Sequence, residues 1–128
     1  MIKHLSVIIG SVALGAVAII IYYFWGYTTI IKSPAVYEGL LSYAFEGRNF
    51  SPCNYQDEYW WVLSDNGDIG YDLHFATTGD HYKPAFVRAL MEVSNQGQYG
   101  HLGGSDREIV LLEIEEISSD IPDYCNKT

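Results

Sequence analysis

Apolar residues are distributed along this chain in two different ways. Between His4 and Lys32 they form a run of 27 residues, Leu5 to Ile31, that contains no charged side chain. About 20 helical residues cross a hydrocarbon core of roughly 30 Å, so the run predicts a transmembrane helix. Beyond it, apolar and polar residues alternate over short stretches, which is typical of half-buried strands.

We interpret the apolar run as an uncleaved anchor rather than a signal peptide. A signal peptide has an apolar core of about 7–15 residues before a small-residue cleavage site. Here the small residues Ala16–Ala18 are followed directly by isoleucines and by aromatic residues such as Trp25, which favour the membrane interface. Ser11, Gly15 and Ala18 share one helical face, so we expect another membrane helix to dock there. The alternative is that they reflect only the usual composition of such helices.

The anchor divides the chain into residues 1–32, with a short cytoplasmic end, and one small domain at 33–128. The basic residue Lys3 and the N-terminal amine precede the span, which favours a cytoplasmic N-terminus. Residues 33–128 contain five Lys and Arg against 16 Asp and Glu, a formal charge of −11 compared with −9 for the whole chain. Such a field repels phosphate backbones and argues against nucleic acid as a partner.

Both cysteines, Cys53 and Cys125, lie in the domain that the anchor would export. An oxidising compartment favours a disulfide between them, which would close a loop of about 73 residues and stabilise the fold by roughly 4 kcal/mol. Two free thiols are the alternative. A zinc site is not expected, because two isolated cysteines lack the usual close ligand spacing.

Short stretches of strand-forming residues predict a mainly β domain. A turn is predicted at Phe50–Cys53, and a hairpin is predicted around Asn66-Gly67. Arg107–Ile117 also fits a helical spacing, but its β-branched residues favour a strand. A small closed or half-closed antiparallel barrel would protect the edges of so many short strands. The five predicted strands are Val36–Phe45, Glu58–Leu63, Ile69–Ala76, Ala85–Val93 and Arg107–Ile117.

Two groups of residues have a familiar arrangement. One is Gln98–Gly103 followed by Arg107–Val110 and Glu113-Ile114; the other is Phe45–Cys53 before the Trp60-Trp61 pair. Together they resemble small bacterial envelope proteins and, more distantly, the OB-like C-terminal domain of the lipoprotein NlpE. The resemblance covers most of residues 36–118 and implies an OB-like barrel on the periplasmic side of the bacterial inner membrane. It also implies that the glycine-rich stretch is a hairpin turn, with His101 as a structural residue.

No motif in the sequence predicts catalysis, a cofactor or a metal. His74, His81 and His101 have separations that match no compact ligand motif. The glycines of Gly97–Gly104 precede Ser105-Asp106 rather than the Lys-Ser/Thr of a phosphate-binding loop. No serine lies in a nucleophile-elbow sequence. An enzyme is therefore not expected.

The aromatic residues are the best candidates for a binding surface, because Tyr and Trp are favoured at interfaces. We expect one of Trp60 and Trp61 to lie in the core and the other to be accessible. Tyr59, Trp60 and Trp61 are the predicted contact residues of the barrel. The wider aromatic set comprises Tyr55, Tyr59, Trp60, Trp61, Tyr71 and Tyr82.

These patterns lead to one functional hypothesis and one alternative. The protein is predicted to be a non-catalytic accessory or assembly subunit of an envelope membrane complex. Its anchor would contact the lipid bilayer and other membrane proteins, and its aromatic barrel face would contact their exported loops. The alternative is a periplasmic module that binds or senses a cell-wall fragment or a metal ion.

Overall fold

The computed structural model describes residues 15–20, 31–44, 47–55, 57–64 and 67–126. The chain divides into two compact units, Met1–Ile30 and Ile31–Thr128. In the first, residues 15–20 form a short helix that includes Gly15 and Ala18, whereas Ser11 and most of the predicted span lie outside the described residues. Within the described part of the chain, no helix has both the length and the apolar character needed to cross a bilayer.

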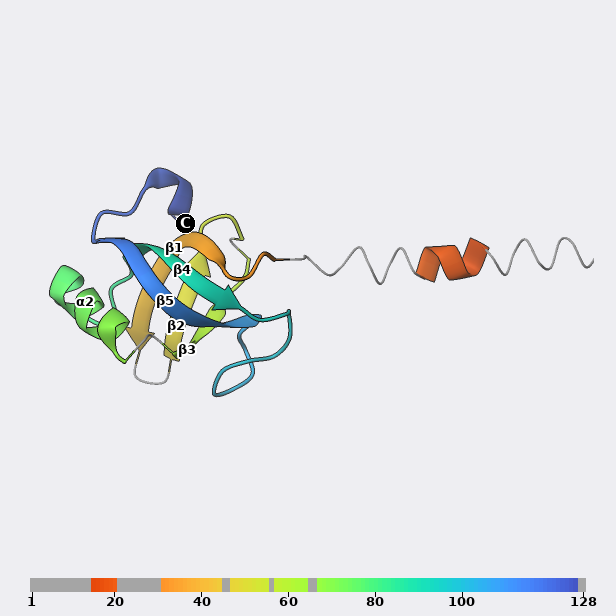
Figure 1. The fold of residues 1–128 in the computed structure, drawn as a ribbon, viewed down its shortest axis with the longest axis horizontal. Helices are drawn as coiled ribbons and strands as arrows, with labels where there is room; N and C mark the ends of the chain where they lie inside the picture. The colour runs from red at the N-terminus through yellow and green to blue at the C-terminus, as the bar shows by residue number, and fades with distance from the viewer. Residues whose placement is uncertain (1–14, 21–30, 45–46, 56, 65–66, 127–128) are drawn as a thin grey trace, which may run out of the picture. The chain divides into compact units, whose positions relative to one another are not determined.

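The second unit is a closed barrel of five strands (Figure 1). The strands are β1 (Ala35–Ala44), β2 (Gly47–Pro52), β3 (Trp60–Ser64), β4 (Ala85–Val93) and β5 (Arg107–Ser118). They follow one another around the barrel in the order β1, β2, β3, β5, β4. All neighbouring pairs are antiparallel except β3 and β5, which run parallel. The prediction of a mainly β barrel is confirmed, whereas the prediction that it is antiparallel throughout is wrong at β3 and β5.

The core follows the predicted alternation. Along β1 the buried positions are Gly39, Leu41 and Tyr43, which share one parity as expected. Their side chains meet those of the other strands inside the barrel, where Trp60 is the largest residue with no exposed surface. The core comprises Leu41, Tyr43, Phe50, Trp60, Val62, Val87, Ala89, Met91, Ile109 and Leu111.

A second buried cluster fastens the C-terminal segment to the barrel. Cys53, just after β2, forms a disulfide with Cys125, at the end of the 3₁₀ helix η1 (Asp123–Cys125). Both cysteines are buried against Phe86 of β4. The predicted disulfide is therefore confirmed in this structure.

One predicted strand is a helix. Ile69–Thr78 forms α2, which packs against β5, β1 and β4 (Figure 1). It begins after Asp68 and ends at Gly79, which has a left-handed backbone and whose N–H donates to the Phe75 carbonyl at 2.8 Å. A glycine in this position is a frequent helix terminator. Ile69–Ala76 was predicted as a strand, and this prediction is wrong. The hairpin turn predicted at Asn66-Gly67 lies partly outside the described residues, and the chain after Gly67 continues into α2 instead of a paired strand.

One observed strand was predicted as a turn. β2 includes Phe50, Ser51 and Pro52, and it pairs with β1 from Ala44↔Gly47 to Gly39↔Pro52. Its composition is poor in strand formers, so pairing with its neighbour overrides local propensity. The prediction of a turn at Phe50–Cys53 is therefore wrong over most of its length.

Candidate binding groove

Trp60 and Trp61 lie on opposite faces of β3, because successive side chains of a strand alternate. Trp60 points inward and is 0% exposed, with the rings of Tyr37 and Phe50 at centroid distances of 5.3 and 5.8 Å. Trp61 is only partly buried and lies on the outer surface. The expectation of one inner and one accessible tryptophan is met. As a contact residue, however, Trp60 is a wrong choice, since it offers no surface to a partner.

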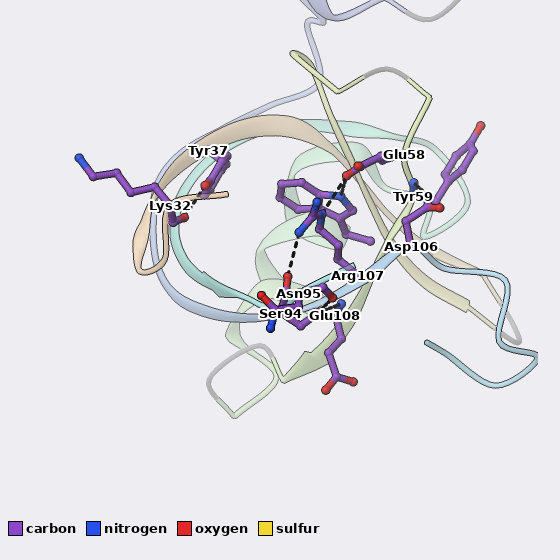
Figure 2. Close-up of polar contacts among 10 residues, drawn as sticks. Lys32, Tyr37, Glu58, Tyr59, Ser94, Asn95, Asp106, Arg107 and Glu108 are labelled. Atoms are coloured by element: carbon purple, nitrogen blue, oxygen red, sulfur yellow. Dashed lines mark hydrogen bonds and ion pairs between the residues drawn. The ribbon is translucent and has the colours of Figure 1, made fainter. Parts of the chain in front are cut away.

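A buried ion pair holds the inner tryptophan in place. The Trp60 indole N–H donates to Glu58 Oε2 at 2.7 Å, and Arg107 Nε donates to the same oxygen at 3.1 Å. Arg107 also donates from a terminal nitrogen to the Ser94 carbonyl at 3.1 Å, so its guanidinium bridges Glu58 and Ser94 (Figure 2). These contacts connect the start of β3 with both ends of the β4–β5 connection. The sequence analysis assigned no role to Glu58 or Arg107.

The same end of the barrel contains Tyr37, whose hydroxyl donates to the Lys32 carbonyl. Burial raises the pKa of the Tyr37 hydroxyl, and nearby Tyr55 adds to this effect. The Tyr37 phenol is thus neutral at physiological pH. We assign a structural role to Tyr37, Trp60 and Arg107, because their polar groups are hydrogen-bonded to other parts of the fold.

The connection between β4 and β5, residues 94–106, is held against the start of β3. Its two sides meet at Tyr99 and Ser105, which exchange two backbone hydrogen bonds of 2.9 and 3.0 Å. At its base, the Tyr59 N–H donates to the Asp106 carboxylate at 2.8 Å, and the Asp106 N–H donates to the Tyr59 carbonyl at 2.7 Å. The connection is therefore a hairpin, as the resemblance implied, and its position beside Tyr59 is fixed.

A groove of about 270 Å³ lies between this hairpin and the outer face of β2 and β3. Tyr59 (54% exposed) and Leu102 (86% exposed) leave it open to solvent. Among the described residues that line it there is no Asp, Glu, Lys or Arg. The lining side chains are Asn49, Tyr59, Trp61, Tyr99, His101, Leu102 and Ser105, together with the backbone of Gly47, Gly100 and Gly104.

Glycines determine where the groove's rings lie. The Trp61 ring lies directly against Gly100, where a Cβ atom would be 2.8 Å from Trp61 Cε3. Gly100 also has a φ of 84°, a conformation that other residues rarely adopt. The Tyr99 ring lies against Gly97 in the same way, 2.9 Å from the position of its absent Cβ. The absence of side chains at these glycines thus leaves space in which the aromatic rings pack.

The structure separates the predicted aromatic set into different regions. Only Tyr59 and Trp61 of that set reach the groove, whereas Tyr71 and Tyr82 line another cavity of about 340 Å³ beside α2. The sequence analysis did not identify Tyr99 and Asn49 as groove residues, and it treated His101 as structural. The glycines on either side of Tyr99 could have indicated positions where an aromatic ring packs against backbone.

The histidines beside α2 do not assemble a recognisable metal centre. His74 is fully buried, and its Nε2 lies 2.7 Å from the Lys83 carbonyl. Burial lowers the pKa of His74, and the backbone of Lys83 partly offsets this effect. The His81 ring stacks on Tyr71 at 4.1 Å and on Phe75 at 4.6 Å. Across the described residues, no group of three or more His, Cys, Asp or Glu side chains could hold a metal ion.

No protein-family model, curated protein or solved structure matches this chain. The function is therefore inferred from the residues of the site. The groove offers fixed aromatic rings, neutral hydrogen-bonding groups and an open shape. This arrangement is suited to binding, because it presents ring faces without a charged group or a paired nucleophile and base among its described lining residues.

Proposed function

We propose that this protein is a non-catalytic accessory or assembly subunit of a bacterial envelope membrane complex. In this proposal, it docks through an N-terminal anchor helix and uses the aromatic face of the barrel as its binding surface. The observation that supports this role most directly is the preformed groove, in which Trp61 and Tyr99 are held by glycine backbone. Prearranged aromatic rings lose little conformational freedom on binding and are frequent interface anchors.

The barrel is OB-like in this proposal. Its strand order of β1, β2, β3, β5, β4, with α2 between β3 and β4, agrees with that interpretation. OB-type barrels bind ligands across strands 2 and 3 and the loops beside them. The groove occupies this region, over β2, β3 and the β4–β5 connection. The resemblance to the domain of NlpE supports the same fold.

We place the protein in the bacterial inner membrane as a single-pass protein with a periplasmic barrel. The charge-free run of 27 residues at Leu5–Ile31 supports the anchor. The Cys53–Cys125 disulfide supports an oxidising compartment for the barrel, because such bonds persist outside the cytosol. Lys3 and the N-terminal amine support a cytoplasmic N-terminus.

Co-purification of the full-length chain tests the subunit role. After tagging and mild detergent extraction, we expect one membrane protein to be recovered in near-equal amounts. Replacing the small face by Gly15→Leu and Ala18→Leu should remove that protein, because large side chains would keep the helices apart. Val17→Leu, which lies off this face, is the matched control. Recovery of the tagged chain as a lone monomer would contradict the proposal.

A second candidate is the ligand-binding module, and the neutral lining of the groove favours one form of it. Asn49, Ser105 and His101 are polar without being acidic, so they suit an uncharged cell-wall fragment better than a metal ion. In this role, ligand would change the fluorescence of Trp61. An unchanged spectrum with wall fragments would argue against it, without bearing on co-purification through the anchor.

A further inference from the structure

We propose that the groove bounded by Tyr59, Trp61 and Tyr99 binds a neutral oligosaccharide chain. The inference rests on the proposed use of this groove as a binding surface, and it names the chemical class of the occupant. It does not depend on the identity of any membrane partner.

The rings of the groove provide the apolar half of the recognition. A pyranose ring has an apolar face of C–H bonds, and the negative face of an aromatic ring attracts the slightly positive hydrogens of such bonds. Trp61 lies against Gly100 and Tyr99 lies against Gly97, so both rings are fixed before a ligand arrives. Such rigid aromatic surfaces provide contact area at a low entropic cost.

The groups beside the rings provide the polar half. Asn49, His101 and Ser105 line the same groove, and together they contain hydrogen-bond donors and acceptors of the kind that pair with sugar hydroxyls. The combination of apolar rings and uncharged polar groups matches the surface of a sugar, which is apolar on its faces and polar around its rim.

Charge argues against the main polymeric alternatives. Residues 33–128 have a formal charge of −11, and the described lining of the groove contains no Lys or Arg. A nucleic acid or an anionic polysaccharide would meet this field without a compensating cation. A neutral chain avoids that repulsion.

The barrel also limits how a peptide could bind. Peptides are often held by strand addition at a free sheet edge. Each of the five described strands pairs with two neighbours, so the barrel leaves only short stretches for main-chain pairing. Recognition by side chains is therefore favoured, as the ring surfaces allow.

The size of the groove indicates a short segment of a longer chain. Its volume of about 270 Å³ lies just below the roughly 300–1,000 Å³ of sites that enclose a drug-sized molecule. Because Tyr59 and Leu102 leave the groove open to solvent, a polymer could continue beyond it.

Titration with defined tetrasaccharides tests this inference on the full-length chain. The detergent must lack a sugar headgroup, because glucosides and maltosides would compete for the groove. The probes are chitotetraose and cellotetraose, and a galacturonic acid tetramer is the anionic control. We expect a saturable change in tryptophan fluorescence with at least one neutral probe and none with the anionic probe. Saturation-transfer NMR should show that sugar C–H protons contact aromatic rings.

Variants locate the binding site. Trp61→Ala should weaken binding about tenfold or more, as for a central interface aromatic residue, whereas Trp61→Phe should retain part of the affinity. Gly100→Ala should also weaken binding, because it displaces the Trp61 ring while leaving every lining side chain present. Tyr82→Ala removes an exposed aromatic residue outside the groove and should leave affinity unchanged. Equal unfolding midpoints would exclude loss of the fold as the cause.

Three results would overturn the inference: no response to either neutral probe at millimolar concentration, equal binding of the anionic probe, or unchanged affinity in both Trp61→Ala and Gly100→Ala. A photo-crosslinking amino acid at position 61 separates this failure from that of the subunit role. If position 61 crosslinked to a protein and no sugar changed the fluorescence, the proposal of a glycan ligand would be overturned. The proposal of an accessory subunit would stand.

Discussion

Trp60 and Trp61 are identical residues in consecutive positions, yet they occupy two different environments. Trp60 is surrounded by core rings, and its N–H donates to a carboxylate that is paired with a buried arginine. Trp61 lies outside, against the backbone of Gly100. The comparison indicates that the inner face of β3 determines stability, while the outer face is available for binding.

The two environments differ most in how many groups depend on one another. Inside, Trp60, Glu58, Arg107 and the Ser94 carbonyl form one connected network, so removing one member leaves others without a partner in a low-dielectric site. Outside, the Trp61 ring lies against the Gly100 backbone in a groove that is open to solvent. Substitutions on the two faces should therefore have different consequences.

The largest effects on stability are expected from Arg107→Met and Trp60→Ala, which disrupt the same buried network. Arg107 is 2% exposed, and its loss would leave Glu58 (15% exposed) with an uncompensated charge. Breaking a buried pair in this way costs about 3–5 kcal/mol of unfolding free energy, measured by urea denaturation. Arg88→Met is the matched control: Arg88 pairs with three glutamates but is 43% exposed, so its loss should cost about 1 kcal/mol or less. Similar losses of unfolding free energy for Arg107→Met and Arg88→Met would contradict the distinction between the buried and the exposed face of the barrel.

Removing the disulfide should have the next largest effect. The Cys53→Ala, Cys125→Ala double variant releases a loop closed between residues 72 positions apart. Loss of such a bond from a small domain costs about 2–5 kcal/mol, which comparison of urea midpoints would measure. A reducing agent should destabilise the original chain and leave the double variant unchanged. If the double variant and the reduced original chain both had the urea midpoint of the untreated original chain, the inner core alone would maintain the fold.

The sequence was sufficient for the elements whose pattern coincides with their burial. β1, β4 and β5 alternate or are rich in β-branched residues, and all three were predicted within two residues of their observed bounds. The cysteine pairing was predicted from the number of cysteines and from the expected oxidising compartment. These signals are local or compositional, so they do not require knowledge of neighbouring segments.

The remaining elements depend on partners that are distant in the sequence. β2 has few strand-forming residues and exists because β1 pairs with it along most of its length. The buried positions of α2 are Gly70 and His74, which are not apolar, whereas its large apolar residues are 38–50% exposed. Those apolar residues alternate as they would in a strand, so the sequence pattern concealed the helical period of α2. They are Ile69, Tyr71, Leu73 and Phe75.

The groove could be predicted only in part, for the same reason. Tyr59 and Trp61 were identified by residue type alone. Tyr99, Asn49 and His101 became groove residues because the β4–β5 hairpin lies over β2 and β3, which no local pattern reveals. The contact between Gly100 and Trp61 spans 39 positions and depends on the closed barrel.

A smaller effect, dependent on pH, is expected from His74 on the buried face of α2. Burial lowers the pKa of His74 in the folded state below its ordinary value near 6.5. The unfolded chain therefore binds more protons in this range, and stability should fall as the pH decreases through about 6.5 and toward the folded pKa. His74→Gln can still donate to the Lys83 carbonyl and should lose this part of the pH dependence. Unfolding midpoints measured between pH 8 and 5 would show it, and identical profiles for both proteins would exclude His74 as the cause.

The smallest effect on stability is expected from Trp61→Ala, although this residue is as large as Trp60. A partly exposed side chain that packs on one glycine should contribute about 1 kcal/mol or less to the free energy of unfolding. Trp60→Ala should instead cost about 3–5 kcal/mol, because it removes a core ring and leaves Glu58 without its indole donor. Urea denaturation of both variants measures the difference directly. If the two losses were equal, the outer tryptophan would be part of the structural core, and its position on the surface could no longer be explained by a binding role.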